Sequence, residues 1–182
     1  SYIIPGEEIT IRDAWNLMLV ASSNDAAALL ARIMFGSDEQ TVSMMNAKAR
    51  NLGLKHTVFA DPTGLSADNV STARETAALA RLGLSFPEIR QVVQQNKFIF
   101  TPKGKAGREI KSTNQMLTWF RPPEVVVFGG KTGHIEESGY NLVFSAGNKK
   151  YELVGVVLGS KSNETRFSEM LRLLQGGFEI SK

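Results

Sequence analysis

The chain has 182 residues, 42% of them hydrophobic and 21% charged, with a net charge of +3 at pH 7. These values describe a globular protein with its own core; they exclude a disordered segment, and the small charge argues against a nucleic-acid-binding protein. No cysteine is present and the two histidines lack metal-ligand spacing, so we expect no disulfide, no metal site and no cofactor.

The first half of the sequence predicts helices, each opened by a capping signal. Thr10 with Asp13 precedes the first helix, and either Ser23 or Asn24 caps the second. Ser37 with Gln40, Ser71, and Ser85 before Pro87 are the later signals. The predicted helices cover 11–20, 25–34 (closed by Gly36), 38–49 (stopped by Gly53), a stretch from 71 to 84, and one from 87 onwards.

The second half predicts antiparallel strands followed by a last helix. Two short strands flank a Lys- and Gly-rich turn, and three longer ones include a hairpin at 147–150. The predicted strands are 98–100, 109–110, 125–128 leading into Lys131, 140–146 and 151–158, and the helix is 164–174. We therefore predict an α+β fold in a single domain, 1–182: a helical block, then an antiparallel sheet covered by the C-terminal helix.

Gly129-Gly130-Lys131-Thr132 does not fit a nucleotide-binding P-loop. That loop needs a glycine five positions before Gly130, where this chain has Val125 within a predicted strand. A long helix should follow, whereas the sequence predicts a further strand.

The same stretch, Lys131-Thr132-Gly133-His134, fits the edge of a peptide-binding site. A strand-borne Lys131 supplies a positive charge for a carboxylate, and the Thr132 hydroxyl adds a hydrogen bond. Gly133 lets a peptide lie against the strand, and the backbone N–H of His134 can donate to an oxyanion. We expect no direct chemical role for the His134 imidazole.

Ser22 and Asn24 lie between two predicted helices, where a helix cap is the simplest interpretation. A hydroxyl and an amide on one connection can also transfer a proton and bind a substrate carbonyl. The two roles do not exclude each other.

The order of several short motifs resembles the serine D-alanyl-D-alanine carboxypeptidases, the low-molecular-mass penicillin-binding proteins of the DD-peptidase/β-lactamase superfamily. The resemblance covers nearly the whole chain. The motifs are Ser22-x-Asn24, Met45-Asn46-Ala47-Lys48-Ala49, Asn51-Leu52-Gly53-Leu54, Pro62-Thr63-Gly64-Leu65, Ser71-Thr72-Ala73-Arg74-Glu75, and Lys131-Thr132-Gly133-His134 with Ser138-Gly139-Tyr140-Asn141-Leu142-Val143.

The resemblance implies catalytic roles for Ser22, Asn24 and Lys131, and substrate binding by Lys131, Thr132, Gly133 and His134. Ser22 would relay a proton to the leaving D-alanine, and Asn24 would hold the substrate backbone. Lys131 and Thr132 would bind the terminal carboxylate of a peptidoglycan stem peptide ending in D-Ala-D-Ala.

The family's nucleophile motif, Ser-x-x-Lys, is absent: no serine or threonine here is followed three positions later by lysine. The resemblance places that motif and the first strands upstream of Tyr2, so the fold should be an incomplete DD-peptidase fold. The apolar start at 1–6 predicts a piece cut from a longer precursor. Half a dozen apolar side chains left uncovered would cost on the order of 10 kcal/mol. We therefore expect an N-terminal fragment, a second copy, or residues 1–8 to fill the gap.

The sequence thus predicts the C-terminal larger part of a D-Ala-D-Ala carboxypeptidase domain, acting outside the cytoplasmic membrane and without an anchor in this chain. By itself the chain should be inactive, binding β-lactams only with the missing segment. Three alternatives remain open. They are a non-catalytic module that binds peptidoglycan or a partner, a DD-endopeptidase, and a β-lactamase. The Ser138–Val143 motif and the lack of an evident deacylation glutamate loop argue against the β-lactamase.

Overall fold

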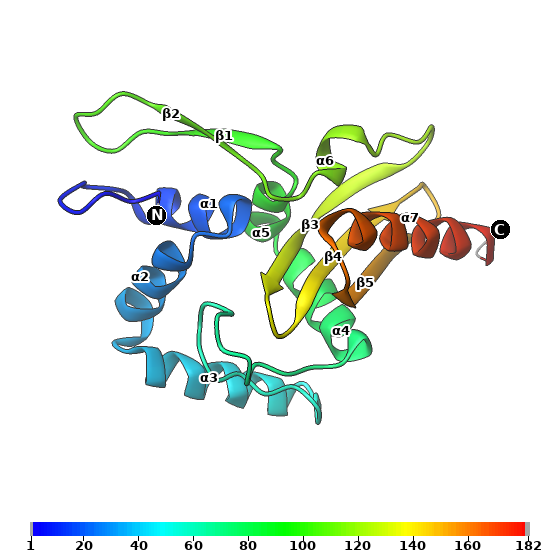
Figure 1. The fold of residues 1–182 in the computed structure, drawn as a ribbon, viewed down its shortest axis with the longest axis horizontal. Helices are drawn as coiled ribbons and strands as arrows, with labels where there is room; N and C mark the ends of the chain where they lie inside the picture. Colours follow the sequence, from blue (N-terminus) through cyan, green and yellow to red (C-terminus); the bar gives the residue numbers. More distant parts are fainter. Residues whose placement is uncertain (1, 181–182) are drawn as a thin grey trace.

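The computed structural model describes residues 2–180 and contains helices in both halves, with two separate sheets (Figure 1). The helices are Ile11–Ala21 (α1), Asn24–Phe35 (α2), Asp38–Asn51 (α3), Ala73–Leu84 (α4), Pro87–Val93 (α5), Met116–Trp119 (α6) and Asn163–Ile180 (α7). The strands are Lys97–Phe100 (β1), Arg108–Lys111 (β2), Val126–Ile135 (β3), Gly139–Gly147 (β4) and Glu152–Ser160 (β5).

The larger sheet is antiparallel in the order β3-β4-β5, so β4 is central and β3 lies at an edge. Helix α7 packs on β4 and β5, and α4 and α5 contact the sheet from its other face (Figure 1). Successive side chains of β4 point to opposite faces of the sheet: Phe144 points toward α7, whereas Val143 lines a groove beside α4. The predicted α+β architecture, a helical block and a meander with a covering C-terminal helix, is confirmed.

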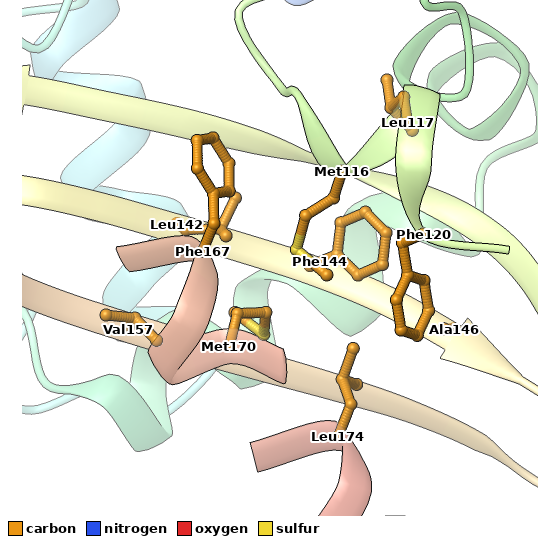
Figure 2. Close-up of a cluster of buried hydrophobic side chains, with 10 residues drawn as sticks. All are labelled: Met116, Leu117, Phe120, Leu142, Phe144, Ala146, Val157, Phe167, Met170 and Leu174. Carbon is orange, nitrogen blue, oxygen red and sulfur yellow. The ribbon is translucent and has the colours of Figure 1, made fainter. Parts of the chain in front are cut away.

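The main core lies between this sheet, α6 and α7 (Figure 2). Phe144 and Met170 are fully buried there, and the rings of Phe120 and Phe144 meet edge to face at 5.7 Å between centroids. Such a contact adds to the stabilisation from burial alone. The core therefore fixes β4, and β3 through its pairing with β4.

A second core joins α1 and α2 to the small β1–β2 hairpin. Leu17 and Phe100 are fully buried in it, and Phe98 pairs with Ile110 in register. The predicted hairpin is confirmed, and so is the capping pair at Thr10, whose hydroxyl accepts from the Asp13 N–H at 3.0 Å. For α2 the structure selects Ser23 as the N-cap, so Asn24 is the first residue of the helix.

Two predicted caps are wrong. Thr72, not Ser71, caps α4, because the Thr72 hydroxyl is the one that accepts from the Glu75 N–H, at 3.2 Å. Phe86 precedes α5 without a side-chain cap, and the Ser85 hydroxyl instead donates back to the Leu82 carbonyl oxygen at 2.7 Å. Pro87 does begin the helix, as predicted.

Other differences concern element lengths. The four-residue helix α6 was not predicted, and α7 runs six residues beyond the predicted Leu174. Strand β3 continues through the whole Lys131–His134 motif and ends at Ile135. The motif therefore lies within the strand, which sets the direction of its side chains.

Candidate functional site

Strand β3 presents Lys131 to the helical block because a bulge bends the strand just before it. The pairing with β4 shifts register between Val127 and Gly129. Gly129 has φ +97°, and a Cβ there would collide with the backbone of Val93 at the end of α5. Only glycine allows this close approach, and a bulge of this kind redirects the residues that follow.

Ser22 lies directly opposite, on the connection between α1 and α2. Its φ of 56° is in the left-handed region, which is uncommon for a residue other than glycine and recurs at functional sites. The neighbouring Ser23 is buried and caps α2, with its hydroxyl 3.3 Å from the Ala26 nitrogen. The capping role therefore belongs to Ser23, which leaves the Ser22 hydroxyl directed at β3.

The ammonium of Lys131 joins the two elements. It donates to the Ser22 hydroxyl and, at 2.7 Å, to the backbone carbonyl of Thr132. Burial and, to a lesser extent, the positive charge of Arg166 together lower the pKa of Lys131 to about 8. The structure thus brings together two predicted site residues that are 109 positions apart in the sequence.

The other predicted residues surround this pair in different environments. Thr132 is buried, with its hydroxyl oxygen 2.5 Å from that of Thr113. The His134 ring is exposed and stacks on Tyr140, with the ring centroids 3.9 Å apart. Asn24 lies exposed at the first position of α2, two residues from Ser22.

Arg166 is a residue of the site that the sequence did not indicate. It extends from α7, is buried, and donates from Nη1 to the carbonyl oxygens of Gly133 at 3.1 Å and Asn141 at 3.3 Å. Its Nε has no partner among the described residues. Burial lowers the pKa of Arg166, although the guanidinium stays charged. No sequence pattern could reveal it, because its role depends on how α7 packs across the sheet.

A groove of about 280 Å³ opens beside Lys131 and is almost wholly apolar. Leu19 of α1, Leu79 of α4 and Val143 of β4 are among its lining residues. Residues 2–8, the described part of the N-terminal segment, do not fill it, because Glu7 pairs with Arg108 at 2.9 Å and Glu8 with Lys103 at 2.5 Å, both at the β1–β2 hairpin. The expectation that residues 1–8 cover the gap is therefore wrong for the described residues 2–8, and the open groove counts against the expectation that the place of the missing segment is filled in this chain by itself.

A second groove, of about 560 Å³, lies beyond the motif toward the β3–β4 turn. Gly133 and His134 form one side of it, and the loop between α3 and α4 forms the other, including Val58 and Val70. Asp61 organises this loop by accepting hydrogen bonds from four backbone N–H groups, those of residues 63–66. The loop wall is thus built by backbone contacts to one carboxylate.

Within residues 2–180, no group of three histidine, aspartate or glutamate side chains is placed to hold a metal ion. None of the helices in this part of the chain is long and apolar enough to cross a membrane.

Comparison with curated proteins gives a consistent set of relatives. The chain is 34% identical over 182 residues to D-alanyl-D-alanine carboxypeptidase DacC of Escherichia coli, covering 98% of this chain and 43% of that protein. It is 30% identical over 178 residues to D-alanyl-D-alanine carboxypeptidase DacF of Bacillus subtilis, covering 97% and 45%. A D-alanyl-D-alanine endopeptidase of Haemophilus influenzae is 35% identical over 162 residues, covering 88% and 54%. The chain thus spans less than half the length of the two carboxypeptidases.

Solved structures agree with the fold. The Streptomyces K15 DD-transpeptidase superposes with a TM-score of 0.88 at 28% identity, over 98% of this chain and 71% of that one. A D-alanyl-D-alanine carboxypeptidase of Mycobacterium tuberculosis gives 0.74 at 29% identity, over 86% and 58%. The family model for D-alanyl-D-alanine carboxypeptidase (peptidase S11) matches residues 1–162. The chain belongs to the D-alanyl-D-alanine carboxypeptidase family.

Proposed function

We propose that the protein carrying this chain is a serine-type D-Ala-D-Ala carboxypeptidase that acts on peptidoglycan stem peptides outside the cytoplasmic membrane. The contact between the Lys131 ammonium and the Ser22 hydroxyl is the observation that carries the proposal. This contact of a cation with a hydroxyl lies at the β3 edge of the larger sheet. Within the described residues, no further strand pairs with β3 on that side.

The roles of the residues follow from their chemistry. Lys131 binds the terminal carboxylate of the substrate, with Thr132 beside it, and Gly133 leaves room for the peptide along β3. The His134 N–H donates to the oxyanion, and Asn24 holds the substrate backbone. Ser22 passes a proton to the departing amine, for which its hydroxyl can both donate and accept.

The reaction requires a nucleophile from outside the 182 residues. A serine oxygen attacks the carbonyl carbon of the penultimate D-alanine while its proton passes to the lysine of the Ser-x-x-Lys segment. Ser22 relays that proton to the amine of the terminal D-alanine, which leaves as the C–N bond breaks. Water then hydrolyses the ester and regenerates the serine. Because some relatives are named D-alanyl-D-alanine endopeptidase, the alternative function is cleavage of a cross-linked peptide by the same chemistry.

We infer that the apolar groove beside Lys131 receives the segment that bears this serine, as a preceding part of the polypeptide or as a second copy. Residues 1–182 would then form the larger, C-terminal part of one domain. The argument is energetic: the Leu19, Leu79 and Val143 side chains that line the groove are half-buried, and covering their remaining exposed surface contributes part of the about 1.5–3 kcal/mol that full burial of such a side chain gives.

Labelling with a fluorescent penicillin tests the proposal. Protein that includes the Ser-x-x-Lys segment should form a labelled adduct and release D-alanine from a D-Ala-D-Ala peptide, whereas residues 1–182 alone should not be labelled. A labelled band from the chain alone would disprove the assignment of the nucleophile. Peptide binding without turnover by the longer protein would favour a non-catalytic peptidoglycan-binding module instead.

A further inference from the structure

The bulge in β3 decides on which face of the larger sheet Lys131 lies. The pairing of β3 with β4 skips Phe128, which is therefore the extra residue of the bulge. Because of this extra residue, Lys131 pairs with Val143, which lines the groove beside α4. Without it, Lys131 would lie opposite Leu142, whose side chain belongs to the core under α7. The bulge thus puts the ammonium on the face from which it reaches Ser22.

Arg90 of α5 holds this bulge in place. The central carbon of its guanidinium lies 4.2 Å from the centroid of the Phe128 ring, within the range of a cation–π contact. Its Nη2 pairs with the Glu152 carboxylate of β5 at 2.5 Å, and its Nε donates to the Leu84 carbonyl oxygen at the end of α4 at 3.1 Å. One side chain therefore joins α4, α5, β3 and β5.

Glu152 extends these contacts to the central strand. Its other carboxylate oxygen accepts a hydrogen bond of 2.7 Å from the hydroxyl of Ser145, which is fully buried and pairs with Gly129. A buried hydroxyl needs a partner, so Ser145 fixes the position of the carboxylate. Arg90 contacts one residue of the bulge, Phe128, and Ser145 pairs with the next, so both are tied to the same Glu152 carboxylate.

We propose that Arg90 is a positioning residue for Lys131, acting through the bulge of β3. It anchors the bulge through Phe128 and Glu152, and the anchored bulge sets where the ammonium meets Ser22. None of the roles proposed for the site residues involves Arg90 or Glu152. The kinetic test of this inference rests on the proposed function, because it measures how Lys131 recognises a terminal carboxylate.

The kinetic test compares two peptides on protein that includes the nucleophile segment. One ends in D-Ala-D-Ala with a free carboxylate, and the other is the same peptide with a terminal carboxamide. Wild type should favour the free acid, because Lys131 pairs with the carboxylate. Arg90→Met and Glu152→Ala should each reduce this preference in kcat/KM by about five- to tenfold, less than the about 100-fold that a 1 Å misplacement can cost. A partial loss of fold would instead lower kcat/KM equally for both peptides.

The two variants remove charges of opposite sign, which separates an effect of position from an effect of charge. Through space, loss of the Arg90 cation would weaken binding of a carboxylate, and loss of the Glu152 anion would strengthen it. A positioning role predicts a loss in both variants and no additional loss when they are combined. The matched control is Arg81→Met, because Arg81 is an exposed cation on α4 outside this network; this variant should keep the wild-type preference.

Titration of Lys131 gives a second readout that does not need turnover. The NMR resonance of its Cε, assigned by comparison with Lys131→Met, reports the pKa of the ammonium. We expect Arg90→Met and Glu152→Ala both to raise this pKa from about 8 toward the ordinary value, because the ammonium leaves its buried position. Arg81→Met should leave it unchanged.

A wild-type preference together with a wild-type Lys131 pKa in Arg90→Met would overturn the positioning role while leaving the proposed function in place. Shifts of opposite sign in Arg90→Met and Glu152→Ala would also overturn it, since they would show a through-space effect of charge. If the wild type turned over neither peptide, the proposed function would fail, and the titration of Lys131 alone would decide the positioning role.

Discussion

Replacing Lys131 with methionine tests whether the site holds a charge that destabilises the fold. Burial and then Arg166 lower the pKa of Lys131 from 10.5 to about 8. At about 1.4 kcal/mol for each pH unit, the protonated lysine costs the folded chain about 3 kcal/mol relative to the unfolded one. Methionine removes this cost but also loses the hydrogen bonds to Ser22 and the Thr132 carbonyl. We therefore expect Lys131→Met to raise the free energy of unfolding near neutral pH by about 1–3 kcal/mol.

The sign of the pH dependence makes this prediction specific. Because the folded pKa of Lys131 lies below the unfolded value, the unfolded chain binds more protons between pH 8 and 10.5. Wild-type stability thus gains from rising pH in that window, and the advantage of the variant is full below pH 8 and disappears near 10.5. Urea denaturation of both proteins across this range measures the difference.

An exposed lysine provides the control for this experiment. Lys55→Met should change the free energy of unfolding by no more than about 0.5 kcal/mol at any pH in the range. A Lys131→Met protein that is less stable than wild type throughout, or a gain that does not change with pH, would refute the reasoning. The same variant should also lose binding of peptides that end in a free carboxylate.

Two further predictions concern the scaffold of the site. Phe144 is fully buried under α7, so Phe144→Ala should lower the free energy of unfolding by about 3–5 kcal/mol in urea denaturation; a loss below 1 kcal/mol would show that the core relaxes around the cavity. Burial opposes ionisation of Asp61, but backbone hydrogen bonds led by that of Gly64 outweigh it and keep the pKa of its carboxyl below the ordinary value. Asp61→Asn should therefore speed amide hydrogen exchange at residues 63–66 while leaving α1 unchanged, and unchanged exchange in the loop would contradict this role.

Local signals were sufficient to predict most of the fold. The capping pair at Thr10 and the run of strand-forming residues at 140–146 each depend on neighbours in the sequence, and the structure confirms both. The end of α7 could not be predicted in this way, because Gly176 and Gly177 resemble a helix stop. The helix continues since Gly177 lies against Leu153, where a Cβ would come within 2.8 Å of a methyl group, and Phe178 packs on the core.

The part of the site that depends on local sequence motifs could also be predicted. Ser22 and Lys131 were identified from motifs, and the structure places them in contact. Arg166 and Thr113 were missed because each acts through a contact with another element: Arg166 with the carbonyl of Gly133, and Thr113 with the hydroxyl of Thr132. Short sequence patterns carry no information about such contacts.

Thr113 connects the helical block to the larger sheet at the site. Its backbone N–H donates to the Val20 carbonyl at 3.2 Å, near the end of α1, and its hydroxyl meets that of Thr132 on β3. Val20 and Ser22 belong to the helical block, whereas Thr132 and Lys131 belong to the sheet. The position of Ser22 relative to Lys131 is therefore held by Thr113 as well as by the Ser22–Lys131 hydrogen bond. A substrate carboxylate that draws the Lys131 ammonium away from Ser22 would leave the Thr113 contacts in place, so the two halves of the site can stay in register while the ammonium changes partners.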